Sequence, residues 1–288
     1  MHTPDSDIAE NLEEWYSYKK RKAVSWRRIS ANIRTYSFFI RQLVKITFLE
    51  DFKRSHLGLL WLFILPIIAA VAWIALNGAG VIEPGDIGVP YPAFVLLSTA
   101  IWGFFIEIYR NTSSIFLSGG RMKLMASFPY EAFVAEKIIV HLVRFVIPFL
   151  INIIVLLLFG VRFTWTILLF PFSLIPLFLL GLSIGLIVSL FRVLLEDLAI
   201  LIDQGMGFLM FFTPVVYSPD LKLGFLSKVI QVNPLTYLVG FSRDLLIKGT
   251  FYEPWTWAAC SLFSMLAFLI AVYIFAVAEP RVIERLIK

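Results

Sequence analysis

The sequence predicts an all-α membrane protein with six transmembrane helices. Of its 288 residues, 59% are hydrophobic and only 16% are charged, whereas soluble domains are about half apolar and about a quarter charged. The apolar residues form blocks, several of which reach the roughly 18–20 residues that cross a hydrocarbon core. The blocks are long and do not alternate apolar with polar residues, so helices are favoured over a β-barrel. These observations exclude an ordinary water-soluble enzyme and a disordered chain.

Stretches with few or no charges place the six predicted spans. They are residues 57–76, 91–106, 138–160, 163–191, 198–216 and 254–278. The fourth stretch is long and contains prolines and glycines, so we expect it to be bent. Charged residues inside a span are costly unless they find a partner of opposite sign. We therefore expect two structural ion pairs, one between Glu107 and Arg144 and one between Arg110 and Asp203.

Lysine and arginine residues are concentrated on one side of these spans. Eighteen of them lie before residue 55, in the connection 118–137, at Arg192 and in the C-terminal tail, against five on the opposite side. Cytoplasmic connections carry the excess of positive residues. We therefore expect a multi-pass protein of the cell inner membrane with both termini in the cytoplasm. Residues 1–55 would form a cytoplasmic segment, and residues 56–288 a transmembrane domain with a cytoplasmic tail.

The segment 29–48 has apolar residues at helical spacing, with arginine and lysine at the other positions. This pattern predicts an N-terminal amphipathic helix that lies flat in the cytoplasmic headgroup region. A helix of a small cytosolic domain is the alternative. It is disfavoured because too few apolar residues precede the segment to form a core.

A second unusual segment lies between the fifth and sixth spans. It contains two short amphipathic runs, residues 225–232 and 235–247, which the helix-breaking pair Asn233-Pro234 separates. Each run is too short and too charged to cross a membrane alone. Two re-entrant half-helices that enter from the outer face fit this pattern. A hairpin on the surface of the outer leaflet is the alternative.

The sequence lacks motifs of catalysis or metal binding. The three histidines are scattered, and no cluster of Cys, His or Asp has metal-ligand spacing. No glycine-rich loop is followed by Lys and Ser or Thr, so the chain lacks the phosphate-binding loop of nucleotide hydrolases. We therefore expect a transport protein, not an enzyme, whose energy comes from another chain. An integral membrane glycan or lipid transferase is the alternative from a different class.

Five landmarks resemble, in their order and spacing, the permease subunit of ABC-2 type exporters of polysaccharides and polyol phosphates. They are the run 52–58 followed by Trp61 and Pro66; Trp102 with Phe104-Phe105; Phe128-Pro129; the run 213–219; and Asn233-Pro234-Leu235 followed by Arg243 and Gly249. The resemblance covers nearly everything from Phe52 to the C-terminus. The loop 118–128 departs from the family pattern because it lacks an asparagine and paired lysines.

The resemblance implies a homodimer of this chain, joined to two copies of a cytosolic ATP-binding subunit. That subunit would hold ATP and Mg²⁺, and this chain would need no cofactor. The substrate would be a lipid-linked polysaccharide such as O-antigen, capsule or teichoic acid, and nucleic acid would play no part. An ABC-2 permease for a drug or small lipid is the nearest alternative. The short external connections and aromatic-rich spans favour the glycan.

The same resemblance suggests roles for four groups of residues. The substrate channel would use aromatic rings, which pack against sugar C–H groups: Trp61, Trp73, Phe104, Phe105, Tyr109, Phe212 and Tyr217. The inner mouth would use Lys53 and Arg54 to attract an anionic headgroup. Coupling to the ATP-binding subunit would involve Arg121, Met122, Lys123, Leu124, Phe128 and Pro129. The outer gate would contain Asn233, Pro234, Tyr237 and Arg243. Ordinary lipid-facing packing and positive-inside retention are the alternatives for the aromatic and basic residues.

Overall fold

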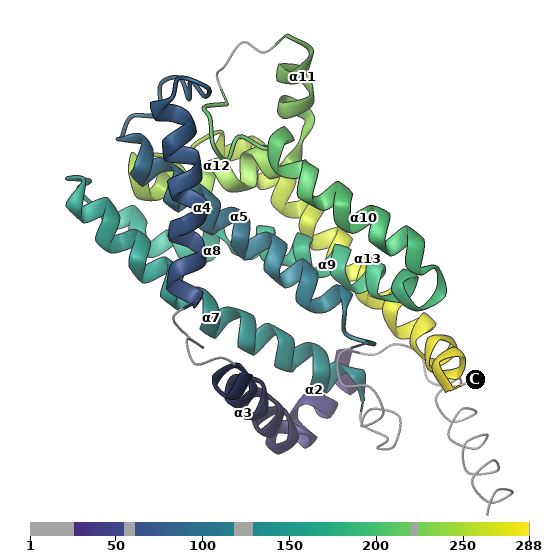
Figure 1. The fold of residues 1–288 in the computed structure, drawn as a ribbon. Coiled ribbons are helices and arrows are strands. Elements are labelled where there is room, and N and C mark those ends of the chain that lie inside the picture. The colour runs from purple at the N-terminus through teal and green to yellow at the C-terminus, as the bar shows by residue number, and fades with distance from the viewer. Residues whose placement is uncertain (1–25, 55–60, 118–128, 220–223, 288) are drawn as a thin grey trace, which may run out of the picture.

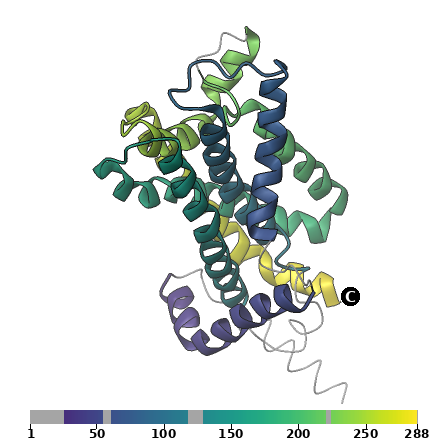
Figure 2. The ribbon, with the colours of Figure 1, turned by 60° about the vertical axis from the view of Figure 1, so that its left-hand side comes forward.

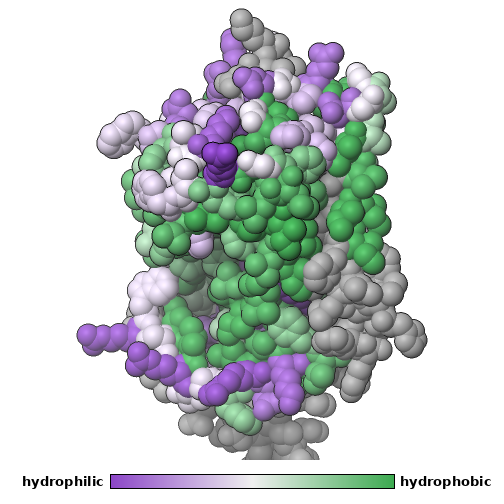
Figure 3. Space-filling model, turned by 90° about the vertical axis from the view of Figure 1, so that its left-hand side faces the viewer, coloured by the Kyte–Doolittle hydropathy of each residue, from purple (hydrophilic) through white to green (hydrophobic). Residues whose placement is uncertain are grey.

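The computed structural model describes residues 26–54, 61–117, 129–219 and 224–287, and the regular structure within them is helical (Figure 1). Within these described ranges, four segments are long and apolar enough to cross a membrane. They are α5 (Tyr91–Ser113), α7 (Tyr130–Leu158), the interrupted segment Trp165–Leu194 and the Pro254–Glu279 part of α13 (Pro254–Ile287). A continuous hydrophobic band lies between hydrophilic ends on one face of the molecule (Figure 3). The all-helical membrane protein that the sequence predicts is confirmed.

Two further helices occupy the other predicted spans. α4 (Trp61–Gly78) corresponds to the first of them. The fifth predicted span contains α10 (Glu196–Phe208), of 13 residues, followed by a 3-10 turn, η3 (Leu209–Phe212). Helical structure ends there because Thr213 is extended, with φ −116° and ψ 130°, as expected for a residue that precedes a proline. The helix therefore ends before the predicted boundary at residue 216.

α9 (Ile175–Leu194) packs against both α5 and α13, and these are the two most extensive helix contacts among the described residues. Two glycines one turn apart on α9 face α5. A Cβ atom added to Gly181 would lie 2.7 Å from Ile108 Cγ2, and one added to Gly185 would lie 2.8 Å from the Tyr109 carbonyl oxygen. Small residues four positions apart allow membrane helices to approach in this way. The two glycines therefore set the distance between α5 and α9.

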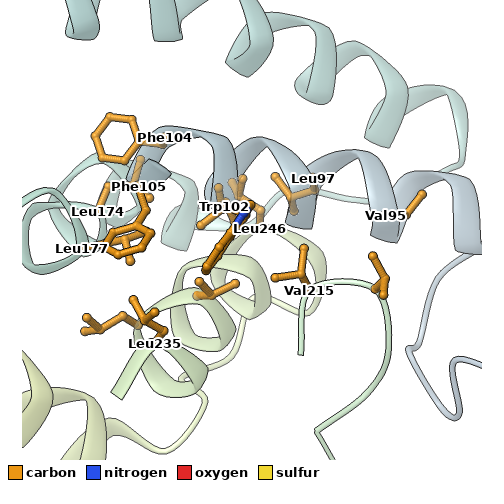
Figure 4. Packing of buried hydrophobic residues seen from close by; sticks show 14 of the residues in the cluster. Val95, Leu97, Trp102, Phe104, Phe105, Leu174, Leu177, Val215, Leu235 and Leu246 are labelled. Atoms are coloured by element: carbon orange, nitrogen blue, oxygen red, sulfur yellow. The ribbon is translucent and has the colours of Figure 1, made fainter. Parts of the chain in front are cut away.

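The main hydrophobic core is built around α5, which contributes buried side chains from Tyr91 to Tyr109. Its side chains pack against the start of α9, the turn after η3 and α12 (Pro234–Ile247). Figure 4 shows Trp102 beside Leu246 and Phe105 beside Leu177. α5 is therefore the central helix on which the other elements assemble.

The fourth predicted span is interrupted, as its prolines and glycines suggest. It begins with a 3-10 helix, η2 (Trp165–Leu169), continues as the single turn α8 (Phe170–Ser173), and becomes regular only in α9. Pro171 and Pro176 stand at the first turns of α8 and α9, where proline is tolerated because the N–H group has no partner there.

The predicted helix over 29–48 is present as two helices, α2 (Trp26–Thr35) and α3 (Ser37–Arg54), separated at Tyr36. The expected amphipathic pattern is found in α2 but not over the length of α3. Both lie across one end of α7 (Figure 2). Thr47 Oγ1 donates to Glu136 Oε1 at 2.9 Å, and Asn32 Nδ2 donates to Glu131 Oε1 at 3.4 Å. These contacts hold α2 and α3 against the bundle.

The two short helices between the last two predicted spans are also present, as α11 (Phe225–Val232) and α12. They lie at the end of the bundle remote from α3 (Figure 1). Asn233 separates them, and its Oδ1 caps α12 by accepting from the Leu235 N–H at 3.0 Å. Twelve of the fourteen α12 residues are buried, in contact with α5, α8 and α13. α12 is therefore an internal helix of the bundle.

A leucine at Gly185 should weaken the fold. The side chain would collide with the Tyr109 carbonyl and the Thr112 side chain, and overpacking of this kind costs about 2 kcal/mol or more. We expect a lower midpoint of thermal unfolding in detergent for Gly185→Leu. Gly103→Leu on α5 is the control, because a Cβ atom there has no neighbour within 4 Å. Equal midpoints for the two variants would contradict this account.

Candidate functional site

A polar network joins the ends of α5 and α9 to the middle of α10. Arg192 Nη2 lies 2.8 Å from Asp203 Oδ2, and the Tyr109 hydroxyl donates to Asp203 Oδ1 at 2.5 Å. Arg192 Nε also donates to the Ser113 carbonyl at 3.0 Å. One guanidinium therefore holds the end of α5 and the carboxylate of α10 together.

This network corrects one predicted ion pair. The structure gives Asp203 the partner Arg192 instead of the predicted Arg110, which is exposed. Adjacent residues of a helix point about 100° apart, so Tyr109 faces α10 whereas Arg110 faces outward. Arg192 was assigned to the connection after the fourth span, but it lies in the last turn of α9, within reach of the bundle interior.

The other predicted pair is present as a loose cluster between α5 and α7. Glu107 Oε1 lies 3.9 Å from Arg144 Nη1, and Glu107 Oε2 lies 3.9 Å from His141 Nδ1. The imidazole is fully buried and packs against the ring of Phe104, with 4.6 Å between ring centroids. The three side chains form a structural polar contact within the bundle.

The predicted channel aromatics fall into two groups. Phe104, Phe105 and Tyr109 are at most 4% exposed and belong to the core. In this conformation they pack inside the chain, so they do not face a path between two copies. The second group lies at the other end of the bundle, where the half-buried Trp73 packs edge-on against Phe211, with 6.4 Å between ring centroids. The side chain of Trp61, the first residue of α4, is outside the described part.

The second aromatic group adjoins the turn between η3 and α11. Phe212 is 41% exposed, and the Tyr217 hydroxyl donates to the Phe211 carbonyl at 2.8 Å. Asn233 Nδ2 donates to the Phe212 carbonyl at 2.9 Å. A hollow of about 600 Å³ lies beside them, lined by Leu209, Phe212, Lys228, Val229, Val232 and Asn233. The structure thus brings a predicted channel residue and a predicted gate residue to one surface.

Arg243, also predicted at the outer gate, is a buried structural cation. Its Nη1 donates to the Pro214 carbonyl at 2.8 Å, and its guanidinium lies 4.6 Å from the ring centroid of Phe94. Asp244 Oδ1 lies 3.4 Å from Arg243 Nε, and Asp244 Oδ2 lies 3.1 Å from Lys248 Nζ. Sequence analysis did not identify these partners, although the spacing of Asp244 and Lys248 is a recognisable i,i+4 pair.

The remaining predicted residues belong to the outer gate, the inner mouth and the coupling site. Pro234 is the first residue of α12, and the Tyr237 hydroxyl donates to the Gln231 carbonyl at 2.7 Å. Lys53 and Arg54 end α3, and their side chains are outside the described part. Arg121, Met122, Lys123, Leu124 and Phe128 also lie outside it, and Pro129 directly precedes α7. Among the described residues, no group of His, Cys, Asp and Glu could hold a metal ion.

Comparison with known proteins identifies the family. A family model described as ABC-2 type transporter matches residues 39–247, from α3 to the last residue of α12. The chain belongs to the ABC-2 type transporter family. The match includes the polar network, the buried Arg243 and the hollow beside Asn233. This ABC-2 chain is therefore a membrane subunit of a transporter, as the sequence predicts.

Two curated relatives indicate a branch of this family. Both are O-antigen export system permease proteins of Klebsiella pneumoniae. One is 22% identical over 204 residues, and the other is 21% identical over 203 residues. Each alignment covers 69% of this ABC-2 chain and 76% of the relative. The resemblance to polysaccharide export permeases is confirmed at the level of the family.

The Arg192–Asp203 contact should show energetic coupling. A double-mutant cycle with Arg192→Gln and Asp203→Asn should give a coupling free energy of about 1 kcal/mol, because both groups are partly screened by solvent. Chemical unfolding in detergent micelles measures it. The matched cycle pairs Arg110→Gln with Asp203→Asn, and its effects should add. A coupling free energy between Arg110 and Asp203, with none between Arg192 and Asp203, would favour the Arg110–Asp203 pair that the sequence predicts.

Removal of the Arg243 side chain should destabilise the end of the bundle that holds α12. Arg243→Leu takes a donor from the buried Pro214 carbonyl and a cation from the buried Asp244, at a cost of about 3 kcal/mol. The free energy of unfolding of the purified chain tests this expectation. Arg162→Leu, at an exposed arginine, should change it little. An unchanged free energy of unfolding in Arg243→Leu would show that Arg243 does not hold α12 in place.

Proposed function

We propose that this chain is the permease subunit of an exporter of lipid-linked polysaccharide, with O-antigen as the type of cargo. Similarity to two O-antigen export permeases, in a chain of the ABC-2 type transporter family, carries this proposal. The chain works as a homodimer with two copies of a separate ATP-binding subunit. That subunit binds ATP and Mg²⁺, because this sequence has no phosphate-binding loop.

The proposed topology has six spans and cytoplasmic termini in the inner membrane. α4 and the segment formed by α10 and η3 supply the two spans beyond the four long ones. Leu43 of α3 and Val282 near the end of α13 belong to one buried cluster, and Trp26 of α2 packs near Phe268 of α13, with 6.4 Å between ring centroids. Both ends of the described chain therefore lie at the same end of the bundle, which supports an even number of crossings. The excess of basic residues assigns that end to the cytoplasm.

The proposed export path runs between two copies of the chain and is lined by a smaller aromatic set than the sequence suggests. Phe212, Tyr217 and Trp73 remain in it, because they lie near Asn233 at the end of the bundle that becomes the outer end. Phe104, Phe105 and Tyr109 are omitted because they are buried. Exposed aromatic faces hold sugars through C–H contacts. α11 and α12, as re-entrant helices, place Asn233 and Pro234 at the outer gate.

The proposed coupling site is the connection 118–128 together with Pro129. It joins α5 to α7 at the end of the bundle that carries α2 and α3, since Tyr130 of α7 and Leu43 of α3 belong to one buried cluster. In the proposed topology this end faces the ATP-binding subunit. Lys53 and Arg54, at the end of α3, lie near the inner mouth in the same arrangement.

Deletion of the gene in its native host tests the cargo. We expect loss of a cell-surface polysaccharide and accumulation of its lipid-linked form inside the cell, both measured by gel electrophoresis and mass spectrometry of extracted glycans. The intact gene should restore export. Normal surface polysaccharide together with increased sensitivity to a toxic small molecule would identify a drug exporter instead.

The gene-deletion strain also tests coupling of this chain to the ATP-binding subunit. A chain carrying both Met122→Asp and Leu124→Asp should insert in the membrane but fail to restore export, and it should co-purify with less ATP-binding subunit. Val81→Asp, at an exposed position of the opposite connection, is the control and should restore export. Full export by the double variant would reject residues 121–128 as the coupling site without affecting the choice of cargo.

A further inference from the structure

A second hollow, distinct from the one beside Asn233, lies between α7 and the interrupted segment α8–α9. It has a volume of about 420 Å³. Its walls contain only Phe, Leu, Val, Ile and Pro residues, among them Phe104, Phe145, Phe149, Phe170 and Phe178. The rings of Phe149 and Phe170 stack 5.2 Å apart across the two walls. The hollow therefore offers apolar and largely aromatic contacts only.

Both walls of this hollow contain a proline. Pro148 lies within α7, and Asn152 Nδ2 donates to its carbonyl at 2.8 Å. Pro171 lies in α8, just before the chain turns into α9. Proline removes a backbone hydrogen bond and bends a helix that continues through it. One wall is thus a continuous helix that contains a proline, and the other is the interrupted segment before α9.

The exposure of the lining residues shows where the hollow opens. Phe104, Phe170 and Leu174 form a floor that is at most 4% exposed, whereas Val146 and Ile175 on the rim are about half exposed. The hollow therefore opens on the outer surface of the molecule. α7 and the segment Trp165–Leu194 are both long enough to cross a membrane, and residues 142–149 lie at the middle of α7. The mouth consequently faces the hydrocarbon core of the bilayer.

We propose that this hollow binds one acyl chain of a membrane phospholipid. An apolar wall offers no hydrogen bonds to hold water or sugar, and an empty hollow would forfeit dispersion contacts over its whole lining. Acyl chains surround the mouth at this depth in the membrane. The space takes one flexible chain, whereas a helix of a second copy, about 10 Å across, does not fit. The bound chain fills the gap between α7 and the segment α8–α9.

Photo-crosslinking at two neighbouring positions tests this proposal. The photoreactive amino acid p-benzoyl-L-phenylalanine replaces either Phe149, in the hollow, or Leu150, which is 53% exposed on the outer surface of α7. Each full-length chain is reconstituted in vesicles of phosphatidylethanolamine and phosphatidylglycerol, extracted into detergent, washed free of loose lipid and irradiated. Intact mass spectrometry then measures the phospholipid adduct. We expect about tenfold more adduct at position 149 than at position 150.

Three results of that experiment would overturn the proposal. Equal adduct yields at the two positions would show only passing contact with surrounding lipid. A crosslink from position 149 to a second copy of the chain would show that the hollow belongs to a protein interface. An adduct carrying the mass of a polyprenyl phosphate after expression in a glycan-producing host, without phospholipid adduct, would assign the hollow to a different lipid.

A filling substitution provides an independent readout. Val146→Trp places an indole at the rim of the hollow, and the phospholipid that co-purifies per chain should fall by about one molecule relative to the control. Ile154→Trp is that control, because Ile154 is 58% exposed on the same helix and outside the hollow. Both variants must elute as single species in gel filtration. Unchanged lipid content in a well-folded Val146→Trp chain contradicts the proposal.

Discussion

The close approach of α5 and α9 is the constraint on which the rest of the structure depends. Gly181 and Gly185 leave no space for even one methyl group between the helices. Hydrophobic burial contributes little between helices in lipid, so such close backbone packing supplies much of the attraction. α5 can then present one face to α12 and another to α7, and α9 can hold α13 on its far side. The Arg192–Asp203 network joins the same two helices at their ends to the middle of α10.

Much of the fold could be predicted from the sequence because hydropathy and proline positions act locally. The long apolar stretches became α5, α7 and α13, and Asn233-Pro234 separated α11 from α12 as expected. Partner choice could not be predicted in the same way. Asp203 pairs with Arg192 and not with Arg110 because of how the helices are rotated about their axes. The assignment of spans to the sequence does not specify that rotation.

The candidate site was predictable in composition but not in exposure. Aromatic rings are frequent throughout the spans, and their type does not reveal whether they face a path or the core. Phe105 is fully buried whereas Phe212 is exposed, although both were expected in a channel. Arg243 shows the same ambiguity for a charge. A basic residue in an outer segment suggests contact with substrate, yet the Pro214 carbonyl, the Phe94 ring and Asp244 surround its guanidinium.

The burial of α12 has a consequence for how the chain is made. Twelve of its fourteen residues are buried, and part of the surface that covers the helix comes from α13, which follows it in the chain. During synthesis, α12 is made before α13 and lacks the contacts that α13 provides. Its charged residues are also unfavourable in lipid. Folding of this end of the bundle must therefore wait until α13 has been synthesised. A chain truncated before residue 254 would lack α13 and leave α12 partly uncovered, which would make it a substrate for quality-control proteases.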